Sequence, residues 1–133
     1  MTHSSFILLF SDSEVAAVTL ANGNVRILFS AAHVLRYAPN DFEKLIEGFA
    51  RNVELVLSAT MPGLTLNEFM GRISSGRIFV ENQWARQAAF PHTISGPIKL
   101  ELSFANQSHL DIETDGLECR FIGESNFFES MAC

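Results

Sequence analysis

The sequence predicts an α+β fold that is mainly antiparallel β, arranged as a sandwich or a partly open barrel with one short helix. Three observations lead to this prediction. Apolar runs are short, turn-forming residues separate them, and a helical period of 3.6 stands out in one segment. The chain has 133 residues, of which 47% are apolar and 18% charged, so it can bury a core as a single domain over residues 1–133.

The first predicted element is a β-hairpin. Residues 14–20 and 25–30 are apolar runs, and Asn22-Gly23 lies between them. This dipeptide is typical of a tight hairpin turn, because both of its residues tolerate positive φ angles. We expect the second strand to continue toward Val34.

One helix is predicted over residues 41–49. Its apolar residues follow the spacing i, i+3, i+4 and i+7, which places them on one helix face. These residues are Phe42, Leu45, Ile46 and Phe49. Asn40 or Asp41 could cap the N-terminus, and Gly48 lies near the end of the segment.

The central part of the chain alternates strands and turns. Residues 53–58 are typical of a strand, and residues 61–63, Met-Pro-Gly, are typical of a turn. Residues 64–69 fit more than one structure. Residues 71–80 indicate a tight turn that leads into a strand, and residues 81–91 are expected to be irregular.

A second hairpin is predicted near the C-terminus. Residues 98–104 alternate apolar and polar side chains, and Leu110 and Ile112 continue the same alternation after residues 105–108. The two runs would pair across that short connection.

The segment 109–119, HLDIETDGLEC, tests the main alternative to a strand. Its carboxylates at every second position, followed by Gly116, match the first half of an EF-hand calcium loop. That loop needs a bidentate Glu at its twelfth position, and counting from Asp111 this position is Ile122. The alternation with period two favours a strand, with Asp115-Gly116 as a turn or bulge.

The sequence contains no motif for a cofactor, a metal or a nucleophile. The phosphate-binding, dinucleotide, zinc-protease and Ser-elbow patterns do not occur, and Cys119 and Cys133 lack the spacing of metal ligands. We therefore expect a protein that is not an enzyme and that uses no cofactor. A Ser, His and Asp site assembled from distant residues stays an alternative.

The localisation predicted from the sequence is cytoplasmic. No apolar run reaches the roughly 18 residues that span a bilayer, and the N-terminal segment lacks the basic start and the cleavage site of a signal peptide. No membrane partner is expected.

Acidic residues are concentrated in the C-terminal part. Residues 1–96 have eight acidic and seven basic side chains, net −1, whereas residues 97–133 have seven and two, net −5. On the predicted strands, four of these carboxylates point away from the core and form a candidate partner-binding surface. They are Glu101, Asp111, Glu113 and Glu118. Such a surface would attract a basic protein and repel nucleic acid.

Two segments carry a resemblance to known proteins. Residues 95–106, SGPIKLELSFAN, and residues 128–133, FESMAC, resemble small uncharacterised β-rich bacterial proteins. Their general plan is similar to that of immunity proteins, which neutralise contact-delivered toxins. The resemblance implies a non-catalytic cytoplasmic protein that binds a partner, such as a basic toxin, and it assigns no functional residue.

Two further functions are compatible with the sequence. A small barrel with a Phe-rich interior could hold an apolar molecule, and this hypothesis requires an internal cavity. A structural protein could form homo-oligomers by pairing exposed strand edges.

Overall fold

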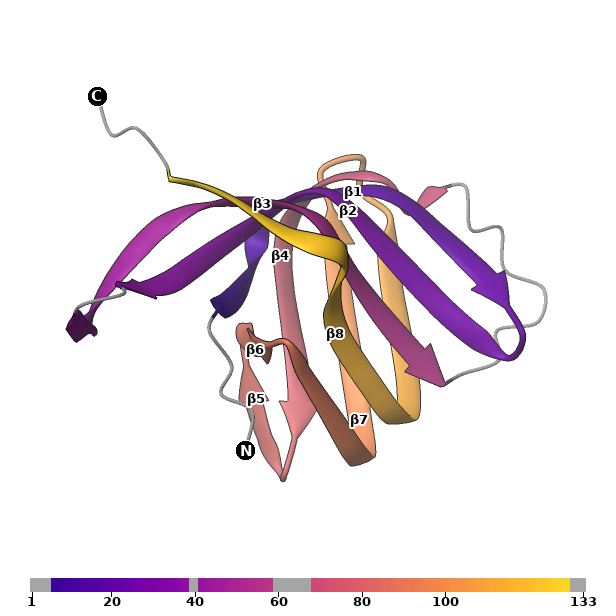
Figure 1. Ribbon diagram of the computed structural model, residues 1–133. Helices are drawn as coiled ribbons and strands as arrows, with labels where there is room; N and C mark the ends of the chain where they lie inside the picture. Colours follow the sequence, from indigo (N-terminus) through magenta and orange to yellow (C-terminus); the bar gives the residue numbers. More distant parts are fainter. Residues whose placement is uncertain (1–5, 39–40, 59–67, 130–133) are drawn as a thin grey trace.

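Figure 1 shows the computed structural model, which describes residues 6–38, 41–58 and 68–129. These residues form one antiparallel sheet. Its strands are β1 (Phe6–Ala21), β2 (Asn24–Ala38), β3 (Asp41–Ser58), β4 (Gly71–Val80), β5 (Gln83–Ala85), β6 (Gln87–Phe90), β7 (His92–Phe104) and β8 (His109–Glu129). The described part of the chain contains no helix with the length and apolar character needed to cross a membrane.

Six of the strands close into a barrel. The sheet order is β5-β4-β7-β8-β3-β2-β1-β6, and an additional pairing joins β4 to β1. This closing contact is short, because it pairs only Glu14 with Arg72 and Val15 with Gly71. The prediction of a mainly antiparallel β fold is confirmed, and its architecture is a closed barrel.

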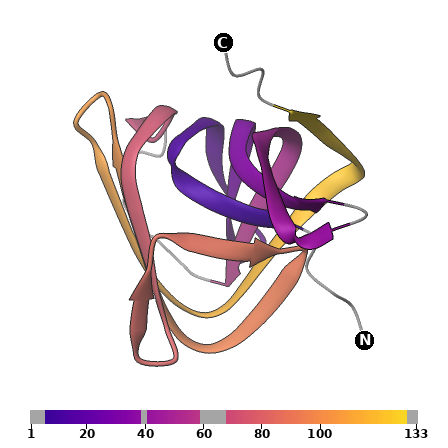
Figure 2. The same ribbon diagram turned by 90° about the vertical axis from the view of Figure 1, so that its left-hand side faces the viewer.

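A single chain segment fills the gap where β1 and β4 separate. β5 pairs with the end of β4, and β6 pairs with the start of β1 (Figure 2). Residues 81–91, expected to be irregular, therefore contain two short strands. They follow a turn in which Glu81 and Asn82 have φ angles of 53° and 63°.

The strands that flank the β2–β3 hairpin each have a long bulge. Residues 10–13 of β1 lie opposite a single residue of β2, Ala32. Residues 122–125 of β8 lie opposite a single residue of β3, Asn52. Ala32 pairs with Ala50, so the two bulges occur at nearly the same level of the sheet. Bulges bend a sheet and increase its twist, and this is where the sheet changes direction.

Beyond the bulges the sheet extends away from the barrel, and we call this extension the wing (Figure 1). It contains residues 31–38 of β2, residues 41–51 of β3 and residues 126–129 of β8. Residues 6–9 of β1 and residues 87–90 of β6 pair along its other side.

An aromatic cluster joins the inner face of the wing to the barrel. Its members are Phe6, Phe90, Phe121 and Phe127. Neighbouring ring centroids in the cluster are 5.2 to 5.9 Å apart, which is the range of favourable aromatic pairs. The guanidinium of Arg36 covers the ring of Phe127 at 4.5 Å.

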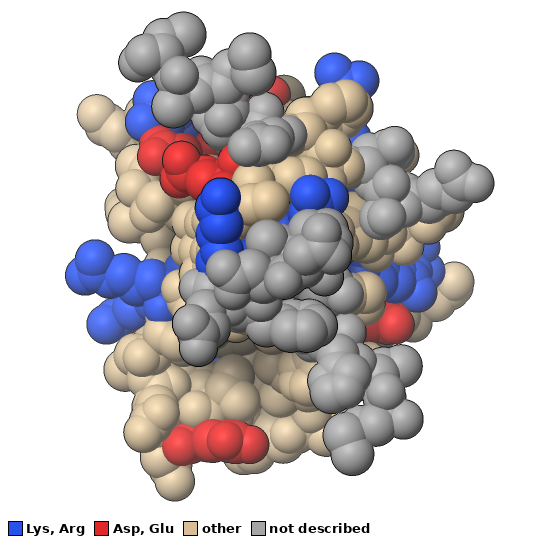
Figure 3. Space-filling model, turned by 60° about the vertical axis from the view of Figure 1, so that its left-hand side comes forward, with Lys and Arg blue, Asp and Glu red and all other residues tan. Residues whose placement is uncertain are grey.

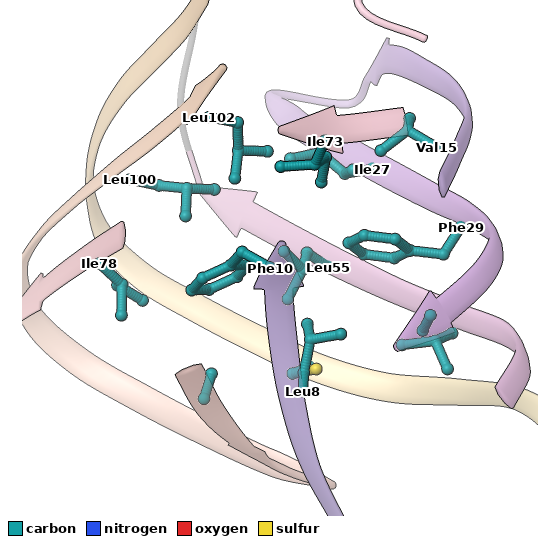
Figure 4. Close-up of a cluster of buried hydrophobic side chains, with 14 of the residues drawn as sticks. Leu8, Phe10, Val15, Ile27, Phe29, Leu55, Ile73, Ile78, Leu100 and Leu102 are labelled. Atoms are coloured by element: carbon teal, nitrogen blue, oxygen red, sulfur yellow. The ribbon is translucent and has the colours of Figure 1, made fainter. Parts of the chain in front are cut away.

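Large apolar side chains fill the barrel interior. They come from every strand that closes the barrel, and Figure 4 shows them directed toward one another. The labelled residues are Leu8, Phe10, Val15, Ile27, Phe29, Leu55, Ile73, Ile78, Leu100 and Leu102. Each is at most 3% exposed, and a fully buried side chain of this size contributes about 1.5–3 kcal/mol.

The helix predicted over residues 41–49 is wrong, because this segment belongs to β3. Leu45 and Phe49 lie exposed on one face of the strand, and Ile46 lies on the opposite face. Apolar residues on both faces produced a spacing that also fits a helix. Pairing with β2 along this segment, and with β8 at Gly48 and Phe49, outweighs that local preference. Gly48 allows close packing, since a Cβ there would collide with the carbonyl oxygen of Phe128.

Both predicted hairpins are confirmed. Asn22 and Gly23 have φ angles of 53° and 77° and connect β1 to β2. The second hairpin pairs β7 with β8, and residues 109–119 form part of a strand. Residues 53–58 also belong to a strand, as predicted.

Two central predictions have other outcomes. Residues 71–80 are strand throughout, so the turn expected at their start is absent from this described segment. The turn predicted at residues 61–63 lies outside the described residues, as does most of the ambiguous segment 64–69.

The packing around Gly76 leads to a stability prediction. A Cβ at this position would lie 2.7 Å from Leu102 Cδ2 and 2.7 Å from Phe10 Cβ. Gly76→Ala should therefore lower the free energy of unfolding by about 1–3 kcal/mol, because the core must shift to accept the methyl group. Urea unfolding followed by circular dichroism measures this change.

Gly116→Ala is the matched control. Its Cβ would meet Ser58 Oγ at 3.6 Å, an ordinary contact. We expect a change of less than about 0.5 kcal/mol. Equal losses in the two variants would contradict the proposed overpacking at Gly76.

Candidate functional site

The structure brings three of the four predicted partner-binding carboxylates together. Glu101 of β7 is opposite Asp111 of β8, and Glu113 is the next outward residue along β8. We call these three residues the acidic strip. Glu118 lies apart from them, farther along β8 and opposite Thr93. The alternation inferred from the sequence correctly placed all four on the outside of the sheet.

Basic side chains neutralise part of this surface. Arg77 Nε lies 2.8 Å from Glu101 Oε1, and Lys99 Nζ lies 3.8 Å from Glu113 Oε1. The three carboxylates of the strip and these two basic partners together have a net charge of −1. Asp111 is exposed and forms no ion pair with any described residue. Arg77 comes from β4. The alternation of buried and exposed residues around it was the sequence signal that could have placed its side chain on the outer face.

Glu118 belongs to a different group of charges. Arg120 Nη1 lies 3.3 Å from Glu118 Oε1, and Arg120 Nη2 lies 3.0 Å from Glu54 Oε1. The side chain of Glu54 is only 8% exposed, although it points to the outer face of β3. Sequence reasoning missed this buried carboxylate, because Glu54 interrupts an apolar run in the predicted strand without any motif around it.

Charges of both signs are mixed over the surface. On the face shown in Figure 3, basic and acidic side chains of the described residues lie among one another. Opposite charges on neighbouring strands reduce the repulsion that four unpaired carboxylates would produce. The long-range field of the predicted site is therefore weaker than the sequence composition suggested.

The outer face of the wing is the largest group of exposed apolar side chains that shares one face of the described sheet. Four of its members are 37–52% exposed, namely Tyr37, Leu45, Phe49 and Phe128. Tyr37 is opposite Leu45, and Phe49 is opposite Phe128, so the face contains two apolar pairs, with Glu47 between them on β3. Ile7, Leu9 and Leu35 extend the face across β1 and β2.

Polar groups are placed within this apolar face. His33 stacks on Phe49 with ring centroids 5.4 Å apart, and its Nε2 lies 2.9 Å from Glu47 Oε2. The guanidinium of Arg51 lies 5.1 Å from the ring centre of Phe128. Aromatic residues together with Arg are enriched in protein interfaces. Sequence analysis missed this face because the helix predicted over residues 41–49 would have buried Leu45 and Phe49.

One Ser–His pair has the separation that catalysis requires. Ser103 Oγ and His109 Nδ1 are 2.8 Å apart on the exposed faces of β7 and β8. A nucleophile of this type also needs a group that orients the base. No described residue forms a hydrogen bond or ion pair with the other ring nitrogen of His109. Within the described ranges, no cluster of three His, Cys, Asp or Glu side chains could hold a metal ion.

Two open pockets lie near the acidic strip. A pocket of about 440 Å³ lies against the β7–β8 pair and is lined by Ser58, Lys99, Glu113 and Thr114 among others. A second pocket of about 200 Å³ is lined by Ser75, Arg77, Arg86 and Glu101 among others. The barrel interior itself is filled by side chains, which counts against an apolar ligand held inside it.

Comparison of the chain with protein-family models, with curated proteins and with solved structures finds no match. The resemblance to immunity proteins therefore stays a prediction.

The buried thiol of Cys119 leads to a pH prediction. Burial between strands raises the pKa of this thiol, and the nearby charge of Glu118 raises it further. In the unfolded chain a thiol ionises near pH 8.5. Because the pKa of the thiol is higher in the folded protein, its contribution to the free energy of unfolding is complete below that pH. The contribution is lost as the pH rises above it, at about 1.4 kcal/mol per pH unit.

Guanidinium unfolding of the natural protein and of Cys119→Ala between pH 7 and about pH 10 measures this contribution. We expect the natural protein to lose more stability than the variant in the alkaline part of the range. Parallel stability curves for the two proteins would contradict the raised pKa.

Proposed function

We propose that this protein is a non-catalytic binding protein whose partner is a basic protein. A toxin that the protein blocks is the most specific form of this proposal. The observation that carries it is the exposed outer face of the wing, where Tyr37 is opposite Leu45 and Phe49 is opposite Phe128.

The composition of this face suits a protein partner. Contiguous exposed apolar patches are uncommon on proteins that act alone, and large aromatic side chains supply most of the affinity in interfaces. Strand pairing restricts the backbone that carries these side chains, which lowers the conformational entropy lost when a partner binds. Phe49 and Phe128 are natural anchors, because His33 and Arg51 already pack against their rings.

The charge of the molecule supports a basic partner. The chain has a net charge of −6, and the acidic strip lies on the β7–β8 pair, at the opposite end of β8 from Phe128. Acidic groups on the surface accelerate association with a basic protein. Since Arg77 and Lys99 offset part of that charge, we expect the strip to affect the association rate modestly and the wing to supply most of the affinity.

The first test uses variants of the wing as bait in affinity capture. Phe49→Ser and Leu45→Ser remove exposed apolar contacts, and the captured protein is identified, purified and titrated by calorimetry. Loss of an anchor should raise the Kd by about 30-fold, the equivalent of about 2 kcal/mol.

Leu20→Ser is the matched control for Leu45→Ser. Leu20 is 46% exposed and Leu45 is 42% exposed, but Leu20 lies outside the wing. A partner that binds the two variants equally well would refute the wing as the contact surface. A dimer of the natural protein that Leu45→Ser dissociates in sedimentation experiments would show that a second copy covers this face.

The second test concerns the acidic strip. Asp111→Asn combined with Glu113→Gln should reduce the association rate with the same partner several-fold at low salt and flatten its salt dependence. Glu81→Gln, an exposed carboxylate on the β4–β5 turn, is the control. Unchanged association kinetics in the double variant would limit the strip to a structural role.

A further inference from the structure

The bulge of β8 creates a pocket on the outer surface of the sheet. Residues 122–125 have a single β3 residue opposite them, so β8 moves away from β3 at this point. The pocket has a volume of about 340 Å³. Its lining consists of Arg26, Glu54, Arg120, Phe121, Ile122 and Gly123. It is separate from the acidic strip and from the apolar face of the wing.

The carboxylate in this pocket already has its partner. Glu54 Oε1 accepts hydrogen bonds from Arg120 Nη2 at 3.0 Å and from Arg120 Nε at 3.3 Å. Arg120 is held in place from its other side by Glu118. Arg120 and Glu54 therefore neutralise each other within the lining of the pocket.

Arg26 has no such partner. Its Nε is buried and makes no hydrogen bond, and its guanidinium forms no ion pair with any described residue. Buried polar groups are almost always hydrogen-bonded, because an unpaired group keeps the full cost of leaving water. Arg36 also has a buried Nε without a hydrogen bond, but its guanidinium lies over the ring of Phe127.

We propose that this pocket binds a small organic monocarboxylate. The carboxylate accepts hydrogen bonds from Arg26, which supplies the net positive charge of the lining, and the apolar part of the ligand packs on Ile122, which is 45% exposed. The single unpaired charge of Arg26 balances one negative charge, so a dianion such as phosphate would leave a second negative charge unbalanced near Glu54. This site is independent of the proposed protein-binding function.

Benzoate, acetate and inorganic phosphate are the probes, titrated into the full chain and followed through backbone amide NMR shifts. We expect saturable shifts at Ile122 and Gly123 with benzoate, with a Kd in the millimolar range or below. Acetate should bind more weakly because it lacks an apolar part, and phosphate should bind more weakly because of Glu54. No saturable shift with benzoate, or tighter binding of phosphate, would overturn the proposal.

Arg26→Gln should weaken benzoate binding by about 10-fold or more, because a charge-assisted hydrogen bond is lost. The variant is expected to fold, since the replaced group has no partner in the folded protein. Arg86→Gln is the control, because Arg86 is exposed and lines a different pocket. If both variants lost the same affinity for benzoate, the loss would come from the change in net charge and not from a contact with Arg26. This result would also overturn the proposal.

Discussion

The shape of this molecule depends on one constraint: the strands must change partners while their backbone groups stay hydrogen-bonded. β1 pairs with β6 before residues 10–13 and with β4 after them. Ser13 stabilises this change, because its hydroxyl donates to the carbonyl oxygen of Leu9 at 2.6 Å and accepts from the amide of His33 at 2.8 Å. The bulge turns β1 toward β4, which closes the barrel and separates the wing from it.

The sequence was informative wherever one face of a strand is buried and the other is solvated. The Asn22-Gly23 hairpin and the β7–β8 pair follow directly from turn residues and period-two alternation. The wing has apolar residues on both faces, so its alternation is lost and residues 41–49 imitate a helix. The two bulges produce no periodic pattern of apolar residues that could be recognised in the sequence. The barrel closure depends on contacts between segments far apart in the chain.

The candidate surfaces were only partly predictable for a related reason. Alternation correctly oriented the acidic side chains, but it contains no information about which strand lies beside them. Strand order brings Arg77 to Glu101, and it buries Glu54 beside Arg120. The apolar face of the wing depends in addition on β3 being a strand, since a helix would have buried Phe49 and Leu45 together. The charges and anchors of a sheet surface therefore become clear only when its order is known.

The bulge of β8 also divides the molecule into parts that can open separately. Among the described residues, β8 beyond Cys119 pairs with β3 on one edge and with no strand on the other. The hydrogen bonds of residues 126–129 can break while the β1–β4 closure stays intact, so the wing has its own free energy of local opening. A partner held by Phe128 would be released when this end of the wing opens, with the barrel still folded. The lifetime of such a complex is then limited by a local equilibrium of the sheet as well as by the contacts across the interface.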